Sequence, residues 1–297
     1  MASPVPAVNR AVGVLDLLVT HPTERFTLSD LVRRTGISLG SAHAVLAVLE
    51  EAGYVSRHRD HKTYGLGPAL VAAGLASLAA QPAVQVAVEG LDRLASDIDA
   101  EVVITATTGT EIIFVAHAGT PSPHGPQVRV GERVPLVPPL GAVFLAWAIE
   151  LDVDTWTARS PVGGPDRDQL RSMLDHVRTH GYSIGAGSDV QRAFGVALAE
   201  LTEQPQQPGL RAEIPGLLLA LAEGGYGLTG VRAQATYDVG IIAAPVFDAE
   251  RRVTVAVTGI GFPPGLTGAQ VVERAEAIRD FGIVATKKAQ GRLPEPG

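Results

Sequence analysis

Polar residues that could contact nucleic acid gather in the first 66 positions of the chain. Ser41 and His43 lie near the start of a helical repeat, where short polar side chains can meet base edges or phosphates in a major groove. A turn with three cations and one acid follows at Arg57–Lys62, and such a turn suits phosphate oxygens. The residues predicted to bind double-stranded DNA are Thr27, Ser38, Leu39, Ser41, His43, Arg57, His58, Arg59 and Lys62.

Two other patterns could carry catalysis or a metal ion. Gly36-Ile-Ser38-Leu-Gly40 matches the G-x-S-x-G elbow of hydrolases, but that elbow follows a strand, whereas the residues before it here have helical spacing. We therefore interpret Ser38 as a helix cap. His176 and His180 have the i, i+4 spacing of metal ligands on a helix, without a third ligand in the pattern. We predict no catalytic residue, no metal and no cofactor, and we keep a hydrolase-like enzyme with an appended helical domain as the alternative.

The residues predicted to contact DNA need a scaffold of short helices. A first helix is expected over residues 7–19, a second begins after the cap Thr27 and ends at Gly36, and a third begins after the cap Ser38. The inward stripe of the third helix is formed by Ala42, Val45, Leu46 and Leu49. Two short strands around the cationic turn complete a basic hairpin. This order of elements predicts a winged helix-turn-helix over residues 5–66.

A connector helix with few charges is expected over residues 67–82. Val71, Leu75 and Leu78 give it an apolar stripe that is too long to leave exposed on a monomer. We therefore predict self-association, as a homodimer or a dimer of dimers. One further helix is expected from Val84 to Ile98, after the break at Pro82.

Strands and helices alternate through the rest of the chain. Strands are expected at residues 101–107, 111–117, 127–130, 239–247 and 253–261. Helices are expected at residues 140–150 and 166–180 and after the cap Thr267, and residues 185–188 are expected to be a loop. Hairpin strands interleaved with helices indicate an α+β domain.

Composition and charge narrow the protein class. The chain has 297 residues, of which 46% are hydrophobic and 19% charged, as is typical of a globular protein with two domains. It contains no cysteine, which excludes disulfides and thiolate metal sites. The net charge is −7, but residues 1–70 carry +1, so the acidic bulk lies outside the predicted DNA-binding part. No signal peptide or membrane span is recognised, and we expect a cytoplasmic protein.

Residues 8–75 resemble the winged helix-turn-helix of the IclR-type transcriptional regulators. The matching stretches are Val8–Leu18, Leu31–Ile37, Ser41–His43, Leu49–Arg57 and Tyr64–Gly67. Two distal stretches, Val130–Leu136 and Ile242–Asp248, are similar to effector-domain signatures of that family. The resemblance implies a ligand-responsive regulator that binds an operator as a dimer or tetramer, with a GAF-like α+β domain for a small-molecule effector.

The resemblance also implies where that effector binds. In the family, a bend before a helix and the last strand line the site. The residues expected to contact effector here are Leu136, Leu140, Gly141, Ala142, Ile241, Thr258 and Ile260. Because this bend is rich in proline and lacks polar side chains, we expect a small apolar or aromatic metabolite.

One part of the chain departs from the family pattern. Residues 186–238 are much longer than the usual loop, and they are expected to contain a helix at 189–203, a linker at 204–209 and a helix at 214–223. This insert could cover the pocket or extend a dimer contact. The predicted organisation is a winged helix-turn-helix at 5–66, a linker helix at 67–82, and an effector-binding and oligomerisation domain at 83–290.

Overall fold

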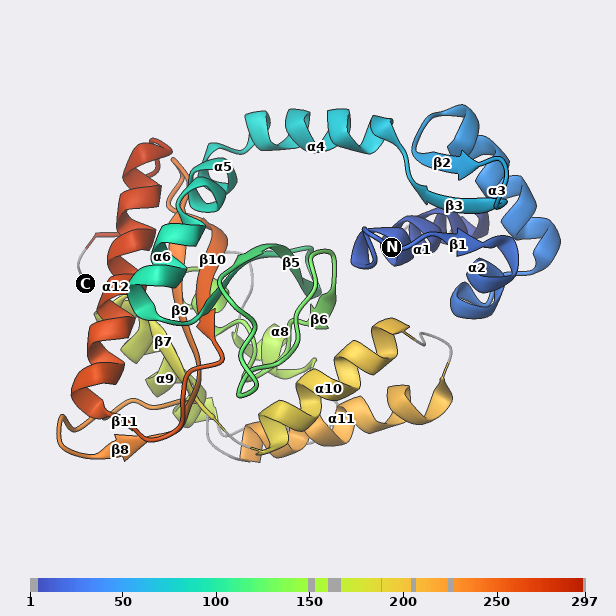
Figure 1. Cartoon of the computed structure of the whole chain (residues 1–297). Coiled ribbons are helices and arrows are strands. Elements are labelled where there is room, and N and C mark those ends of the chain that lie inside the picture. Colours follow the sequence, from blue (N-terminus) through green and yellow to red (C-terminus); the bar gives the residue numbers. More distant parts are fainter. Residues whose placement is uncertain are drawn as a thin grey trace.

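A small N-terminal head and a larger α+β body are joined by one helix in the computed structural model, which describes residues 5–148, 153–159, 167–187, 189–203, 207–223 and 227–295 (Figure 1). The head consists of α1 (Pro6–Thr20), β1 (Phe26–Thr27), α2 (Leu28–Thr35), α3 (Leu39–Glu51), β2 (Val55–His58) and β3 (Thr63–Leu66). Its strands form an antiparallel sheet in the order β1-β3-β2, and the β2–β3 hairpin is the wing. The predicted helices and wing of the head are therefore present.

Local capping chemistry sets the bounds of the head helices. Thr27 accepts a hydrogen bond from the backbone N–H of Asp30, and the Asp30 side chain accepts one from the Thr27 backbone, which closes a capping box. Gly36 ends α2 in the left-handed region at φ 71°, where glycine carries no Cβ penalty. Ser38 then caps α3 by accepting from the N–H of Ser41. Beneath these caps, Val14, Leu18, Leu31 and Leu46 form a nearly water-free core.

The connector helix α4 (Pro68–Ala80) bridges the head and the body along one side of the molecule (Figure 1). None of its residues is buried, and Val71 and Leu75 are 64% and 63% exposed. The chain then bends by 104° into α5 (Pro82–Glu89). No single helix in the described part of the chain is long and apolar enough to cross a membrane, and α4 and α5 would reach that length only if they were straightened into one.

The body is built on a six-stranded antiparallel sheet. Its strands lie in the order β6-β5-β4-β10-β9-β7. Their bounds are Arg133–Pro135 for β6, Glu111–Ala118 for β5, Glu101–Thr107 for β4, Val253–Ile260 for β10, Val239–Phe247 for β9 and Ser183–Ala186 for β7. The short strands β8 (Thr236–Tyr237) and β11 (Leu266–Thr267) pair separately and precede the last helix.

The two faces of this sheet have different neighbours because successive side chains on a strand point to opposite sides. One face packs on α5, α6 (Leu91–Ile98) and the long α12 (Gly268–Lys288), in a core that contains Ile104, Ile242 and Val257. The other face meets α7 (Ala142–Leu145), α8 (Val153–Thr157) and α9 (Arg167–His180), through residues such as Ala243 and Ala256. Helices α10 (Asp189–Glu203) and α11 (Pro208–Glu223) extend from the body toward the head (Figure 1).

A carboxyl group is buried at the start of β4. The Glu101 side chain is 3% exposed, and its Oε1 lies 3.6 Å from Nδ1 of His117 on the neighbouring strand β5. Burial raises the pKa of Glu101 to about 7. Glu101 therefore holds a proton at pH values where the same group in the unfolded chain is ionised.

Three element predictions in the body were wrong. The helix expected over 84–98 is two helices, because at Gly90 the chain turns so close to α12 that a Cβ would lie 2.6 Å from Cε2 of Phe281. Residues 127–130 form no strand; β6 starts at Arg133, after Gly131 turns the chain at φ 87°. The apolar run after residue 140 forms only the short α7 before residue 148, and its predicted end at 149–150 lies outside the described residues.

The bounds of the insert also differ from the prediction. Gly185 and Ala186 belong to β7 and not to a loop, since Gly185 is pressed against Ile241, whose Cγ1 would lie 2.7 Å from a Cβ. Helix α10 has the predicted bounds, whereas α11 begins at Pro208, inside the predicted linker. Proline suits the first turn of a helix because that turn needs no N–H donor. The remaining linker residues 204–206, together with the predicted ends at 166 and 188, lie outside the described residues.

Candidate functional site

The N-terminal end of α3 is an exposed surface on the head. Leu39 is 57% exposed, and His43 is exposed one turn later. Ser38 and Ser41 are joined by a hydrogen bond of 2.9 Å between their hydroxyls, and Ser41 also accepts from Arg10 of α1 at 3.2 Å. The helix start therefore offers hydroxyls, an imidazole and an aliphatic side chain, which are groups that can meet base edges and phosphates.

The wing adds positive charge beside this helix start. Arg57 lies over the ring of Tyr64, with 5.6 Å between its guanidinium carbon and the ring centroid, and Arg59 is exposed near the tip. Lys62 adopts φ 51° in the turn, and the rings of His58 and His61 lie 4.7 Å apart. The cation–π contact holds Arg57 on the wing while leaving its charge in solvent.

The structure brings the residues predicted to contact DNA together on the head, with one distinction among them. Thr27 and Ser38 have helix-capping roles, so their hydroxyls are already engaged. Arg25 was missed by the sequence reasoning, although it lies beside the wing and donates to the Ser56 backbone oxygen at 3.1 Å. A cation placed just before the first strand of a winged head would have been the signal.

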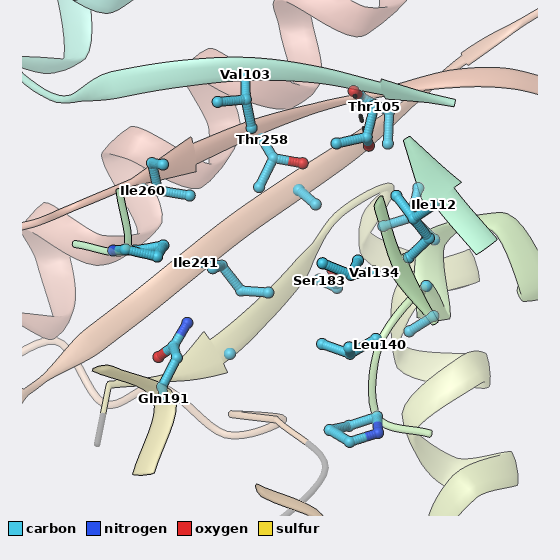
Figure 2. Close-up of a pocket in the computed structure, with 18 of the residues that line it drawn as sticks. Val103, Thr105, Ile112, Val134, Leu140, Ser183, Gln191, Ile241, Thr258 and Ile260 are labelled. Carbon is cyan, nitrogen blue, oxygen red and sulfur yellow. Dashed lines mark hydrogen bonds between the residues drawn. The ribbon is translucent and has the colours of Figure 1, made fainter. Parts of the chain in front are cut away.

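A cavity of about 220 Å³ lies in the body, on the sheet face opposite α12. Side chains of β4, β9, β10 and β7 form its floor and one side, as Figure 2 shows for Val103, Ile241, Thr258 and Ser183. The register explains the convergence, since Thr258 pairs with Val103 on one side and with Ala243 on the other. Phe194 and Leu198 of α10 and Leu221 of α11 close another side.

Polar groups in this cavity are few. Thr105 donates weakly to the backbone oxygen of Ala256 at 3.5 Å, whereas the hydroxyl of Thr258 makes no hydrogen bond to the described residues (Figure 2). Ser183 and Gln191 add a hydroxyl and an amide, and Glu132 adds a carboxylate that accepts from the backbone N–H of Arg129 at 3.1 Å. Among the described residues that line the cavity there is no lysine, arginine or histidine. An anionic ligand would therefore find no counter-charge there.

Six of the seven residues expected to contact effector line this cavity, and Leu136 does not. Leu136 is 2% exposed and lies beneath the bend, where its Cδ1 would be 2.2 Å from a Cβ on Gly141. Because Gly141 adopts φ 86°, the bend directs Leu140 and Gly141 toward the cavity and turns Leu136 into the apolar core below. The backbone of the bend opens only the four-residue helix α7, which is too short to create a strong anion site.

The cavity residues missed by sequence reasoning come from distant segments. Glu132 lies in the loop before β6, Ser183 in β7 and Gln191 in α10. Glu132 lies within the signature-like stretch Val130–Leu136 and Gln191 lies within the insert, whereas no pattern in the sequence pointed to Ser183. Of the two roles expected for the insert, the structure favours covering the cavity.

In the part of the chain that the structure describes, neither of the two alternative chemistries, hydrolysis at Ser38 or metal binding at His176 and His180, has an assembled site. Ser38 serves as the cap of α3, and helix α2, not a strand, precedes it. The rings of His176 and His180 stack with centroids 3.9 Å apart on α9. Within the described ranges, no group of three or more histidine, aspartate or glutamate side chains is placed to hold a metal ion.

Comparison with known proteins matches the head to a family of DNA-binding domains. The model of the IclR helix-turn-helix domain matches residues 7–59. The transcriptional regulator KipR of Bacillus subtilis (strain 168) is 24% identical over 281 residues, covering 95% of this chain and 96% of KipR. XynR of Escherichia coli (strain K12) is 24% identical over 201 residues, covering 65% of this chain and 79% of XynR.

Solved structures share the fold over nearly the whole chain. An IclR transcriptional regulator from Alicyclobacillus acidocaldarius has a TM-score of 0.63 and 20% identity, covering 97% of this chain and all of its own. An IclR homologue from Microbacterium hydrocarbonoxydans, complexed with 4-hydroxybenzoate, has a TM-score of 0.61 and 19% identity, covering 96% of this chain and 99% of its own. The predicted fold class is confirmed as a winged helix-turn-helix joined by a linker helix to an α+β domain.

Proposed function

Because this chain is a transcriptional regulator of the IclR type and not an enzyme, we propose that its head binds an operator in double-stranded DNA. Helix α3 enters the major groove with Leu39, Ser41 and His43, and the wing places Arg57 and Arg59 on phosphates. The observation that carries this proposal is the exposed start of α3 beside a wing whose cations face solvent. The site of action is the cytoplasm, where the operator lies.

The regulator acts as a homodimer or a dimer of dimers. Support comes from α4, whose Val71 and Leu75 are nearly two-thirds exposed, and from α1, on which Val8 and Val12 are 56% and 46% exposed. Large apolar side chains exposed on these two helices favour burial against a second copy. Two heads per dimer also raise affinity for a two-part operator, since the second head binds at high effective concentration.

The cavity of the body binds a small, uncharged, largely aromatic effector. Its volume exceeds the roughly 150 Å³ that accommodates one benzene ring in a protein core, so a single substituted ring fits. The described lining supplies hydroxyl and amide groups for orientation, and it contains no lysine, arginine or histidine to neutralise an anion. The Microbacterium hydrocarbonoxydans homologue is complexed with 4-hydroxybenzoate, which supports a ligand of similar size, with one ring, for this chain. The negative charge of 4-hydroxybenzoate is not part of the proposal.

Two measurements test the proposal. A gel shift with DNA from upstream of the gene for this chain should show binding that survives excess random duplex. Thermal shift of the full chain should show stabilisation by 4-hydroxybenzyl alcohol that exceeds stabilisation by 4-hydroxybenzoate, since the two differ chiefly in charge. Absence of specific DNA binding would contradict the first part, and a stronger response to the carboxylate would contradict the uncharged effector.

A further inference from the structure

Four charged or titratable side chains join the head to the body at the end of α10. Glu203, the last residue of α10, accepts a hydrogen bond of 2.7 Å from Arg34 of α2 and another from Arg129, in the loop between β5 and β6. The Nε2 atom of His21, at the C-terminal end of α1, lies 3.0 Å from the same carboxylate. His21 and Arg34 belong to the head, and Arg129 and Glu203 belong to the body. We call these four residues the Glu203 clasp.

The clasp is partly shielded from water. The side chain of His21 is 1% exposed, that of Arg34 is 21% exposed and that of Glu203 is 32% exposed. Burial raises the pKa of Glu203, but hydrogen bonds from Arg129, His21 and Arg34 outweigh burial and lower the pKa to about 2. Removing the carboxylate would leave the two guanidinium groups and the imidazole without their shared acceptor. Such a loss destabilises a partly buried cluster more than replacing all of its members with apolar residues would.

The loop that supplies Arg129 also touches α1 directly. Gly131 packs so closely on the end of α1 that a Cβ there would lie 2.5 Å from Cγ1 of Val19. Nη2 of Arg133 lies 3.6 Å from Oδ1 of Asp16, on the same helix. The head is therefore held by two parts of the body, the end of α10 and the loop at residues 129–133.

Both parts are also walls of the ligand cavity. Gln191, Phe194 and Leu198 of α10 line the cavity, and Glu203 follows Leu198 at roughly 7.5 Å along the helix axis. The loop lines it through Glu132, whose carboxylate accepts from the backbone N–H of Arg129. Each of these two walls therefore connects the cavity to a member of the clasp.

We propose that the Glu203 clasp couples the ligand cavity to the placement of the head within a single subunit. The inference rests on the proposed function, because it takes the cavity as the effector site. With the clasp formed, the head has one placement against α10 and the loop. With the clasp broken, the head is held by α4 and by the contacts of Gly131 and Arg133 with α1 alone, and its placement varies. Coupling between two sites is reciprocal, so DNA that selects one head placement also alters the walls of the cavity.

The first test measures head placement directly. Since the chain has no cysteine, spin labels can be attached at Glu50→Cys on α3 and Arg171→Cys on α9 without competing thiols. The labelled chain is diluted with unlabelled chain, so that distances within one subunit dominate. The native sequence and the control Glu200→Ala, an exposed residue on the same helix, should give one narrow distance. Glu203→Ala should broaden it, and an unchanged narrow distance would overturn the proposal.

The second test measures the coupling without any effector. Amide hydrogen exchange is followed in residues 127–134 and 189–198, with and without the upstream DNA fragment. DNA should change exchange there by roughly ten-fold in the native chain and in Glu200→Ala, within the usual range of allosteric coupling, and not in Glu203→Ala. No change in the native chain, or the same change in Glu203→Ala, would overturn the proposal. If the DNA fails to bind, the proposed function fails, and the distance measurement alone decides whether the clasp holds the head.

Discussion

Replacing Arg57 and Arg59 together with alanine should weaken binding to every duplex and flatten the dependence of affinity on salt. Both guanidinium groups are exposed on the wing, and in the proposed complex they displace counterions from phosphates. Each phosphate contact contributes about 0.9 to the slope of log affinity against log salt. Two contacts in each of two heads therefore account for about 3.6 of that slope. When the salt concentration rises from 50 to 200 mM, the fold-decrease in affinity should therefore be roughly 100 times smaller for the double variant than for the native chain.

Fluorescence anisotropy with a labelled random duplex and with the upstream fragment, at four or more salt concentrations, measures both slopes. The matched control is Arg167→Ala with Arg171→Ala, which removes two exposed cations from α9. Thermal melts of both variants establish that the head remains folded, because Arg57 contributes a cation–π contact with Tyr64. If the double variant had the same salt dependence as the native chain, the wing would not contact DNA. A slope that also flattens in the control would show a bulk charge effect.

Three further substitutions have defined outcomes. Glu101→Gln should remove a pH dependence of stability, because the fold raises the pKa of Glu101 from 4.5 to about 7. The protonated carboxyl contributes fully to the free energy of unfolding below pH 4.5, and this contribution is lost as the pH rises to about 7. The loss amounts to at most about 3 kcal/mol. Denaturant unfolding at pH 5 and 8 checks this, and equal pH dependence in both proteins would contradict it. Leu75→Glu should shift the sedimentation profile toward monomer and lower operator affinity, because it places a carboxylate on the exposed apolar face of α4 that includes Val71. If the native chain were already a monomer at micromolar concentration, the proposed self-association would be refuted. Thr258→Val should weaken binding of 4-hydroxybenzyl alcohol by a few-fold to ten-fold, which is the value of one neutral hydrogen bond. DNA binding without ligand, measured by gel shift, should stay unchanged. If the variant and the native chain bound the alcohol equally well, Thr258 would not be part of the site.

The head could be predicted closely because its signals are local. Thr27 and Asp30 lie three residues apart and form a capping box, and Ser38 caps the next helix. Gly36 is the residue type that most favours a left-handed helix end. Each signal depends on neighbours in the sequence, so reading the sequence recovers it.

The cavity and the clasp depend on contacts that no local pattern records. Glu203 meets His21 across 182 residues of chain, and Glu132 reaches the cavity only because Gly131 turns the loop. Leu136 was placed in the site because the bend contains it, but the direction in which Leu136 points is set by the left-handed Gly141. The choice between strand and loop at Gly185 likewise depended on its distant neighbour Ile241.

The alternation of side chains along β10 has a consequence for how this regulator can change over evolutionary time. Val255 and Val257 secure the fold against α12, whereas Ala256 and Thr258 face the cavity from the same strand. If the cavity is the effector site, as proposed, substitutions at every second position would change which molecule is bound while the supporting core stays intact. Because the surface proposed to meet DNA lies on a separate head, a new signal would then be acquired without a new set of target genes.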